Sequence, residues 1–437
     1  MTERDTRRCH VAVIGAGVVG LATAVRLVMR GVRVTVIDPN PPGEGCSYGN
    51  AACLSRASVV PLGLPGLWKK VPRYLLDPNG PFRIRWSYAL AAMPWMLRLQ
   101  LASRLDRVNR IADALHSLLD PCVVEWSRLA AWAGVPELIR QEGHAFVYES
   151  EVAFQGDALG RTLRQARGVR IEILQGAEIR AFDESLSPHI THLTWMPEQG
   201  HVTNPERLSK ALAAALRSAG ADFVDAPAID FEFSGNKVSG VRTPARLVDV
   251  DAVVVAAGAY SGPLAAKLGH SVPLDTERGY HVMLPAGTGA PRIPTCSGEG
   301  KFFATPLETG LRIAGTVELA GLEAPPSRAR AQVLCRLAKK MLPAIDATEK
   351  SWWMGRRPSL PDSLPVLGRS RRLPNAFFNF GHGHVGLTAA PISGTAIADL
   401  IIDGESRLDM RPYSPDRFGH PLKNEREIGR ERAIELN

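Results

Sequence analysis

The stretch from His10 to Asp38 places the strongest constraint on how this chain can fold. It reads HVAVIGAGVVGLATAVRLVMRGVRVTVID: a β-branched run, a glycine turn, an apolar helix and a second β-branched run. Gly15, Gly17 and Gly20 form GxGxxG within this order of strand, turn, helix and strand. The first glycine permits a tight turn, the second lets backbone approach a pyrophosphate, and the third lets the helix pack on the strand.

Asp38 ends the second β-branched run, eighteen residues beyond Gly20. At that position a carboxylate accepts hydrogen bonds from a ribose hydroxyl. The N-terminus of the intervening helix offers N–H donors and a positive dipole end to a pyrophosphate. The pattern therefore predicts a dinucleotide site. A glycine-rich turn in another kind of α/β protein is the alternative.

Length and charge narrow the class of protein. At 437 residues the chain exceeds the usual size of a single core, so we expect about two domains. Lys and Arg number 52 against 44 Asp and Glu, a net charge of +8, which suits an anionic cofactor, substrate or membrane surface. No run of Lys and Arg interleaved with aromatic residues is present, so no nucleic-acid partner is predicted.

The six cysteines show no CxxC pair and no Cys/His ligand spacing. This pattern is typical of reduced thiols in a cytoplasmic protein, and it predicts no metal site. No stretch reaches the ~18 uncharged apolar residues that span a bilayer. The segment Trp86–Leu99 has an apolar face with an interspersed arginine. It is either part of an ordinary core helix pair or an amphipathic segment lying on a membrane surface.

The remaining pattern indicates an α/β organisation. Residues 60–135 read as mostly helical and residues 143–195 as strands and turns. The apolar run at 250–256 is typical of a central parallel strand, and it leads into Gly258 at its carboxyl end. Other predicted elements are strands at 221–224, 277–284, 300–307 and 309–319, and helices at 328–341, at 388–402 and after an Asn204 cap with Pro205 at its first position.

Three stretches together resemble the D-amino-acid oxidase superfamily of FAD-dependent oxidoreductases, and within it the bacterial D-amino acid dehydrogenases of the small-subunit type. They are the GxGxxG unit with Asp38, the loop GCSYGNAACLS at Gly45–Ser55, and Trp352–Gly394. The last combines GxRPxxPDxxPVLG with GHGxxGxTxxPxSG and is the most specific. The likeness is diffuse from about 60 to 200.

The resemblance implies an α/β fold with a discontinuous Rossmann-like FAD-binding domain and an inserted α+β substrate domain that contains a mixed or antiparallel sheet. The expected FAD-binding domain comprises 8–60, 200–268 and 355–415. The substrate or cap domain comprises 61–199 and 269–354, and 416–437 form an irregular tail.

The resemblance also implies that FAD is bound non-covalently. The implied contacts begin at the pyrophosphate, with Gly15, Gly17, Val18, Val19 and Gly20, and continue with Asp38 at the ribose, a Val224 amide at the adenine and Gly258 beneath the pyrophosphate. The implied flavin contacts are Ser47, Asn50 and Ala51 from the loop, and Gly383, His384, Val385, Gly386, Leu387 and Thr388 from the late turn. A helix N-terminus beside the flavin pyrimidine edge stabilises the negative charge of reduced flavin.

The resemblance assigns the substrate carboxylate to Arg357, because a guanidinium holds a carboxylate through two parallel hydrogen bonds. Arg356 is the alternative, as is a purely structural role. Tyr280 and His281 lie on a strand that would cover the flavin, but alternation puts them on opposite faces, so we expect one of them at the site. His382 is a further catalytic candidate near the flavin. Related oxidases carry a tyrosine near the strand where this chain has Lys301, Phe302 and Phe303.

The implied activity is oxidative deamination of D-amino acids, or of related imino acids such as hydroxyproline, by hydride transfer from Cα to flavin N5. Electrons would pass to a quinone or another acceptor, and the protein would be cytoplasmic. Peripheral docking on the inner face of the cell membrane is the alternative that the segment Trp86–Leu99 leaves open. Three alternatives stay open. They are an oxidase of glycine, sarcosine or iminodiacetate-type amines that uses O2, a flavin-binding protein without turnover, and a nicotinamide-dependent dehydrogenase.

Overall fold

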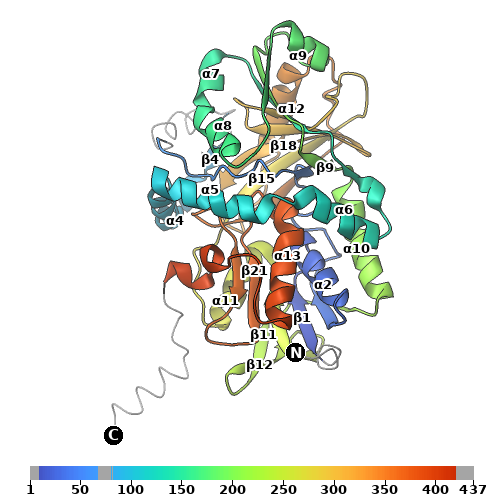
Figure 1. Cartoon of the computed structure of the whole chain (residues 1–437), viewed down its shortest axis with the longest axis vertical. Coiled ribbons are helices and arrows are strands. Elements are labelled where there is room, and N and C mark those ends of the chain that lie inside the picture. Colours follow the sequence, from blue (N-terminus) through green and yellow to red (C-terminus); the bar gives the residue numbers. More distant parts are fainter. Residues whose placement is uncertain (1–8, 67–79, 81, 420–437) are drawn as a thin grey trace.

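The computed structural model describes residues 9–66, 80 and 82–419. It has two halves stacked along its longest axis (Figure 1). The lower half holds the first strand, β1 (His10–Ile14), and the last long helix, α13 (Gly386–Ile402). The upper half holds the long strands β15 (Asp275–Leu284) and β18 (Gly310–Leu319). Segments far apart in the sequence therefore share each half.

A mostly parallel sheet forms the centre of the lower half. Within the described residues it has six strands in the order β10-β2-β1-β14-β21-β20, parallel except for β20. The bounds of the others are β2 (Arg33–Ile37), β10 (Asp222–Val224), β14 (Ala252–Val255), β20 (Val366–Arg369) and β21 (Ala376–Phe380). The β-branched runs predicted four of these strands, β1, β2, β10 and β14, to within two residues.

Different layers cover the two faces of this sheet. Val11 and Val13 pack in one core with α2 (Val18–Val28), α10 (Pro205–Ser218) and α13. Ala12 and Ile14 pack in another with α11 (Ser261–Lys267) and the small antiparallel sheet of β11 (Asp230–Ser234), β12 (Lys237–Arg242) and β13 (Leu247–Asp249). Because alternate residues of a strand face opposite sides and both sides are covered, β1 is apolar from Val11 to Ile14.

Capping residues and prolines in the sequence account for where α10 begins. The Asn204 side chain accepts a hydrogen bond from the Arg207 N–H at the start of α10, and Pro205 takes the first position, as predicted. Helix α13 starts at Gly386, two residues before the predicted Thr388, and ends at Ile402 as predicted. A Cβ at Gly394 would lie 3.0 Å from the Thr23 backbone nitrogen, so a glycine there lets α13 cross α2 closely.

A larger, mixed sheet forms the upper half. In the described part of the chain its order is β19-β15-β18-β17-β16-β6-β8-β7, with β4 also paired to β18. The other bounds are β4 (Phe82–Ile84), β6 (His144–Tyr148), β7 (Glu172–Gln175), β8 (His192–Met196), β16 (Thr295–Ser297), β17 (Phe302–Leu307) and β19 (Ser351–Ser359). The three alternating segments predicted between 277 and 319 are β15, β17 and β18, and helix α12 (Arg328–Met341), which packs against β15 and β18, has the predicted bounds.

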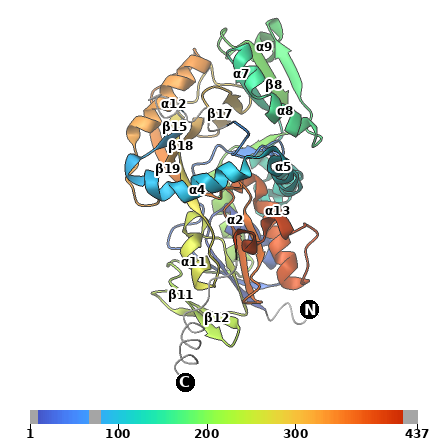
Figure 2. The same cartoon turned by 90° about the vertical axis from the view of Figure 1, so that its left-hand side faces the viewer.

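Helices of the 60–135 region lie across the boundary between the halves (Figures 1 and 2). They are α4 (Ala89–Ala102), α5 (Leu105–Leu119) and α6 (Cys122–Trp132), as the helical prediction for this region requires. Helix α5 contacts α13, and α6 contacts both α13 and α10. A small sheet of β3 (Cys53–Leu54), β5 (Ile139–Arg140) and β9 (Gly200–Val202) lies in the same central region.

The prediction of strands and turns for 143–195 was wrong in part. The region also contains three short helices, α7 (Glu151–Gly156), α8 (Ala158–Gln165) and α9 (Ala177–Phe182). The Ser150 hydroxyl accepts a hydrogen bond from the Ala153 N–H and starts α7. Helices of one or two turns carry too little periodicity to be separated from turns in a sequence.

The predicted domain boundaries stay a prediction, and two elements bear on them. Strand β19 belongs wholly to the upper sheet, whereas a boundary at 355 divides it. Helices α5 and α6 pack on the lower half, although 61–199 was assigned to the other domain. Of the predicted tail 416–437, residues 416–418 belong to the 3₁₀ helix Pro415–Phe418, and 420–437 lie outside the described residues.

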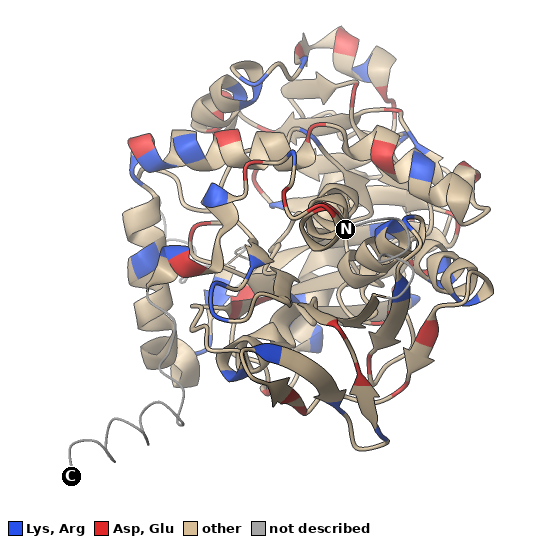
Figure 3. Ribbon diagram, turned by 60° about the horizontal axis from the view of Figure 1, so that its bottom comes forward, with Lys and Arg blue, Asp and Glu red and all other residues tan. Residues whose placement is uncertain are grey.

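Charge, helix hydropathy and metal-ligating side chains are three further features of the described residues. Basic and acidic residues are interspersed over the ribbon (Figure 3). Among the helices of the described ranges, none has the length and apolar character needed to cross a membrane. Within the same ranges, His, Cys, Asp and Glu side chains form no group suited to hold a metal ion.

Candidate active site

One cavity of about 1420 Å³ is lined by residues of both halves. Its lower wall includes Gly15, Asp38 and Gly258, which follow the carboxyl ends of β1, β2 and β14. Open α/β sheets bind ligands at that edge. Pockets for drug-sized ligands measure about 300–1,000 Å³, so this cavity has room for a dinucleotide and a second small molecule.

Most predicted site residues line this cavity. They are Gly15, Gly17, Val18, Val19, Asp38, Ser47, Asn50, Ala51, Gly258, Arg357, His382, Gly383, His384, Val385, Gly386, Leu387 and Thr388. Four described residues that were predicted for the site do not line the cavity: Gly20, Val224, Tyr280 and His281.

The glycine turn at the lower end is tight enough to exclude side chains. Gly15 has φ +117°, and a Cβ there would lie 2.4 Å from the carbonyl oxygen of Ala256. A Cβ at Gly20 would lie 1.9 Å from the Gly15 carbonyl oxygen, so Gly20 serves helix packing rather than the cavity wall. Asp38 accepts a 2.7 Å hydrogen bond from the Ala16 N–H and thereby also holds the turn in place.

The loop Gly45–Ser55 closes over the start of α2. The Ser47 hydroxyl accepts a 2.8 Å hydrogen bond from the Val18 N–H at the helix N-terminus. The Asn50 side chain donates to the Ser47 carbonyl and accepts from the Ala52 N–H, which stabilises Ala52 at φ +61°. A phosphate-binding helix terminus and the loop across it therefore form one hydrogen-bonded unit.

Strands of the upper sheet hold this loop from the other side. Buried Arg312 of β18 donates to the carbonyls of Tyr48 and Asn50, and Thr305 of β17 donates to the Ala51 carbonyl. Burial lowers the pKa of Arg312 to about 10, against opposing effects of Tyr48 and Glu206. The lower and upper halves are thus joined at the cavity by backbone acceptors and side-chain donors.

The late turn Gly381–Thr388 forms a third wall. Gly383 has φ +52°, and its N–H donates to the Pro358 carbonyl. His382 is buried, its Nε2 has no hydrogen-bond partner within the described residues, and burial lowers its pKa to about 3. The imidazole is therefore neutral at physiological pH. The turn leads directly into α13, whose first N–H groups point toward the N-terminal end of the helix.

Three charged or titratable side chains meet at the upper end of the cavity. Glu277 of β15 and Arg357 of β19 are direct cross-strand partners and therefore share one face of the sheet. The His384 Nε2 lies 2.6 Å from a Glu277 carboxylate oxygen. All three residues line the cavity.

The Arg357 guanidinium lies flat against Gly279, where a Cβ would come within 2.0 Å of its Nη2. Its Nη1 donates a 3.0 Å hydrogen bond to the Thr316 carbonyl. Nε and Nη2 donate no hydrogen bond to any described residue, so their N–H groups are available to a ligand. Arg356, the alternative, donates its Nε to the Leu322 carbonyl at 2.7 Å.

Electrostatics keep Glu277 ionised despite its burial, with 1% of its surface exposed. Burial alone would raise the pKa of this carboxyl, but His384 and Arg357 together lower it below its ordinary value. Burial also lowers the pKa of Arg357, while Glu277 and Cys46 oppose that effect. The site therefore holds a guanidinium and a carboxylate on one face of the sheet, with a histidine hydrogen-bonded to that carboxylate.

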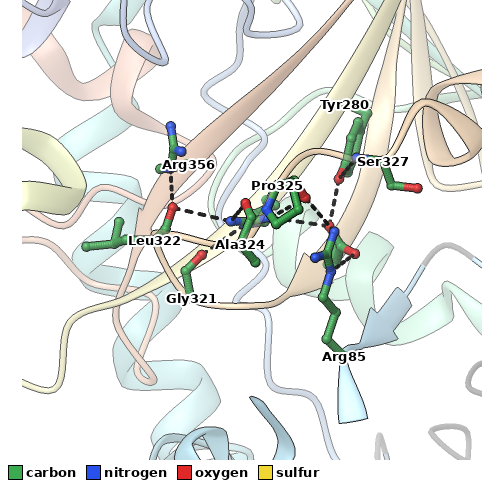
Figure 4. Close-up of polar contacts among 10 residues, drawn as sticks. Arg85, Tyr280, Gly321, Leu322, Ala324, Pro325, Ser327 and Arg356 are labelled. Carbon is green, nitrogen blue, oxygen red and sulfur yellow. Dashed lines mark hydrogen bonds and ion pairs between the residues drawn. The ribbon is translucent and has the colours of Figure 1, made fainter. Parts of the chain in front are cut away.

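The placement of Tyr280 is a correction. Its hydroxyl donates to the Glu318 carboxylate at 2.6 Å and accepts from the Ser327 N–H, in a buried network with Arg278 and Arg85 (Figure 4). The side chain packs in the core beneath α12. Alternation along β15 places Glu277 and Gly279 at the cavity, so Tyr280 faces the other side of the sheet.

His281 is also placed differently from the prediction, whereas the contact of the Val224 amide with the adenine stays a prediction. The His281 ring stacks on Trp353 and its Nδ1 donates to the Gly49 carbonyl at 3.0 Å, so it supports the loop from behind. The Val224 carbonyl accepts from the Asp38 N–H, and Pro227, Ala228 and Ile229 line the cavity instead. Each is held by a backbone partner that no sequence pattern reveals.

The sequence analysis missed Glu277. An acid at the start of the predicted strand 277–284 was the available signal, because a carboxylate is rarely buried without a partner. Lys301 and Phe303 also line the cavity, whereas Phe302 packs in the core. The segment that departs from the related oxidases therefore does face the site.

Comparison with known proteins identifies the family of this chain. The model of the family "FAD dependent oxidoreductase" matches residues 10–400. The chain belongs to this family. It is 41% identical over 416 residues to a D-amino-acid oxidase of Bradyrhizobium diazoefficiens, and the alignment covers 94% of this chain and 99% of the relative. It is 30% identical over 420 residues to a D-amino acid dehydrogenase of Vibrio cholerae, with 94% and 99% covered.

The fold is likewise that of a solved flavoenzyme of the family. Glycine oxidase from Bacillus cereus superposes with a TM-score of 0.69 at 22% identity, covering 92% of this chain and 97% of that one. The discontinuous α/β architecture inferred from the resemblance is confirmed at the level of fold class.

FAD is the cofactor of this FAD-dependent family, and the residues present fit it. The turn at Gly15 is a cradle that a Cβ would fill, the start of α2 carries the adjacent N–H groups, and Asp38 stands at the cavity edge. Gly15, Gly17 and Asp38 would hold the adenosine and pyrophosphate parts, and the Gly383–Thr388 turn would meet the flavin.

Proposed function

We propose that this FAD-dependent oxidoreductase deaminates D-amino acids, or related imino acids such as hydroxyproline, by oxidation at Cα. The observation that carries the proposal is the half-buried Arg357 guanidinium on the cavity wall, whose Nε and Nη2 donate no hydrogen bond within the described residues. A guanidinium fork binds a carboxylate through two hydrogen bonds and so fixes its orientation. The D-amino acid enzymes among the relatives support the substrate class.

FAD, when bound, supplies the two-electron acceptor for the hydride that leaves Cα. Arg357 orients the substrate through its carboxylate. The amine must be neutral, so that its lone pair forms the C=N bond as the Cα–H electron pair departs. The imino product then takes up water and gives a 2-oxo acid and ammonia, whereas a cyclic substrate gives a cyclic imine.

We further propose that the electrons pass to a quinone. Several relatives are D-amino acid dehydrogenases. One part of the cavity wall is apolar, and it suits a lipid-soluble acceptor: Leu62, Leu64, Pro65, Trp95, Met96 and Leu99. Because Trp95 and Leu99 belong to α4, this helix separates the cavity from solvent.

The outer face of α4 supports docking on an anionic membrane surface. Exposed apolar side chains recur every three or four residues, from Trp86 just before α4, through Leu90, Met93, Leu97 and Leu101 on the helix, to Leu105 at the start of α5. Four arginines and no acidic residue occur between 82 and 105, which matches negatively charged lipid. Docking there would bring the apolar wall of the cavity near the lipid in which a quinone dissolves.

Vesicle flotation tests this docking. The wild-type protein should float with phosphatidylglycerol-containing vesicles at low salt, and a Leu97→Glu, Leu101→Glu variant should not. Val152→Glu is the matched control, because Val152 is 83% exposed on α7, away from α4. Wild-type protein that stays entirely in the supernatant at low salt would contradict membrane docking.

Anaerobic reduction of the bound flavin tests the reaction itself. D-, L- and N-substituted amino acids are added without oxygen, and the loss of the visible absorbance of the flavin is followed. D-amino acids or cyclic imino acids should bleach the flavin. Reoxidation should be slow in air and fast with a soluble quinone. A yellow protein that no amine bleaches would favour flavin binding without turnover.

An oxidase that uses O2 is the second candidate. The relative at 41% identity is a D-amino-acid oxidase, which favours oxygen as acceptor over a quinone. Glycine, sarcosine or iminodiacetate-type amines are the alternative substrates for such an oxidase. Rapid peroxide production in air would select this candidate and reject the dehydrogenase.

A further inference from the structure

Glu277 and His384 form a pair at the cavity that the hydride-transfer step does not use. Glu277 is buried on β15, and its carboxylate lies between Arg357 on the neighbouring strand and His384 on the late turn. The His384 side chain is 44% exposed, although its Nε2 is held 2.6 Å from the carboxylate. A half-exposed histidine is thus attached to an anchored acid at the wall where Arg357 lies.

The contact determines which ring nitrogen is available. An ionised carboxylate only accepts hydrogen bonds, so the neutral His384 ring must carry its proton on Nε2 and donate it to Glu277. The lone pair then resides on Nδ1, for which no hydrogen-bond partner is recorded among the described residues. A base oriented by a second group through its other nitrogen is the arrangement that proton-transfer sites require.

We propose that His384, positioned by Glu277, accepts the proton of the substrate ammonium group while Arg357 holds the carboxylate. The inference rests on the proposed function, because it assigns a role in that same reaction. The substrate N–H bond breaks and an Nδ1–H bond forms. The nitrogen lone pair is thereby freed to form the C=N bond when the Cα–H pair leaves as hydride. The proton passes from Nδ1 to water before the next turnover.

Charge balance favours this transfer. Arg357 and Glu277 neutralise each other before the substrate enters, and a zwitterionic amino acid adds no net charge. After transfer the imidazolium lies against the Glu277 carboxylate, while the substrate carboxylate remains on Arg357. No unpaired charge is created in a buried site, where such a charge is costly.

The other titratable groups of the surrounding elements do not compete for this proton. Cys46, from the loop Gly45–Ser55, has its pKa raised to about 11 by burial, partly opposed by Arg357 and Arg356. His382, on the same turn as His384, has its pKa lowered to about 3 by burial. Arg356 and Arg357 on β19 carry N–H donors and no acceptor, so neither can take the proton. His384, whose side chain is 44% exposed and whose Nε2 is held by Glu277, is therefore the acceptor that the geometry of this cluster offers.

The test follows flavin bleaching by a D-amino acid in the holoenzyme over a range of pH. His384→Gln should slow bleaching at neutral pH by about 100-fold, the lower range for a lost general base. Its rate should recover as the pH approaches the ionisation of the substrate amine, so the profile moves to alkaline pH. Glu277→Gln should shift the profile in the same direction, and Glu277→Asp should restore part of it. His189→Gln, at an exposed histidine, is the control and should match the wild type.

A second measurement separates proton transfer from carboxylate binding. Acetate and benzoate carry a carboxylate but no amine, and their Kd is read from the change in flavin absorbance. His384→Gln should leave this Kd unchanged. An unshifted pH profile would overturn the inference, and so would a Kd that rises as in an Arg357 variant, because His384 would then bind the anion. Wild-type flavin that no amino acid bleaches would instead reject the proposed function.

Discussion

The two ends of the cavity are built from different materials. The lower end is made of backbone: the Gly15 turn, the start of α2 and the loop that Ser47 fastens to it. The upper end is made of charged side chains, with Glu277, Arg357 and His384 supplied by β15, β19 and the late turn. The first offers a ligand shape and N–H donors, and the second offers it charge.

This difference predicts how each end fails. A backbone cradle tolerates no added atom, because neighbouring carbonyls cannot move without unfolding the strand that carries them. A side-chain cluster fails by degrees, because each group contributes a separate contact. Substitutions at the lower end should therefore abolish cofactor binding, whereas those at the upper end should change affinity and pH dependence.

The largest effect is expected at Gly15. Gly15→Ala places a Cβ 2.4 Å from the Ala256 carbonyl oxygen at a φ of +117°, so the variant should purify without FAD. Flavin absorbance and the FAD released on heating measure this, with circular dichroism to check the fold. Gly287→Ala is the control, because its Cβ would meet no atom within 4 Å. A Gly15→Ala protein with the full flavin content would remove the distinction between the two ends.

Arg357→Ala should retain FAD and lose substrate affinity. Removing one member of a charge pair that a ligand shares costs about 2–5 kcal/mol, so KM should rise about 30- to 3,000-fold. Steady-state kinetics with an artificial acceptor give KM, and flavin absorbance gives the FAD content. Arg411→Ala, at a side chain that is 91% exposed, serves as control. Unaltered kinetics in Arg357→Ala would show that Arg357 does not bind the substrate.

Tyr280→Phe should affect stability rather than catalysis. The hydroxyl donates to buried Glu318, and losing a hydrogen bond to a charged group costs about 1.5–3 kcal/mol. Urea unfolding should show a free energy of unfolding lower by that amount, with KM unchanged. A raised KM at unchanged stability would return Tyr280 to the substrate site and contradict the orientation of β15.

The smallest effect is expected from acid on His281. Burial lowers the pKa of this histidine to about 3, whereas the unfolded chain has a histidine pKa of about 6.5. The unfolded state then binds more protons, so this contribution to stability is complete above pH 6.5 and is lost as the pH falls, by about 1.4 kcal/mol per unit. His281→Gln should show a shallower loss of unfolding free energy on acidification than wild type, by urea titration at several pH values. An equal slope would mean that His281 is protonated in the folded state.

The elements that sequence reasoning located have causes within a few residues. β1 has the predicted bounds, and so does α12. Asn204 caps α10 as its neighbours dictate. In contrast, α7, α8 and α9 were missed because short helices leave little periodic signal. The direction in which Tyr280 faces was left open, because a period of two does not say which side of a sheet is covered.

The sequence by itself determined the dinucleotide cradle, the family and the arginine that lies on the cavity wall, because each depends on a contiguous run in which local sterics decide the conformation. Only the tertiary structure decided that Glu277 meets His384, 107 residues away along the chain, and that His281 serves the loop rather than the site. Such contacts depend on strand register and on the packing of the two halves, and these arise from the whole core rather than from any one segment.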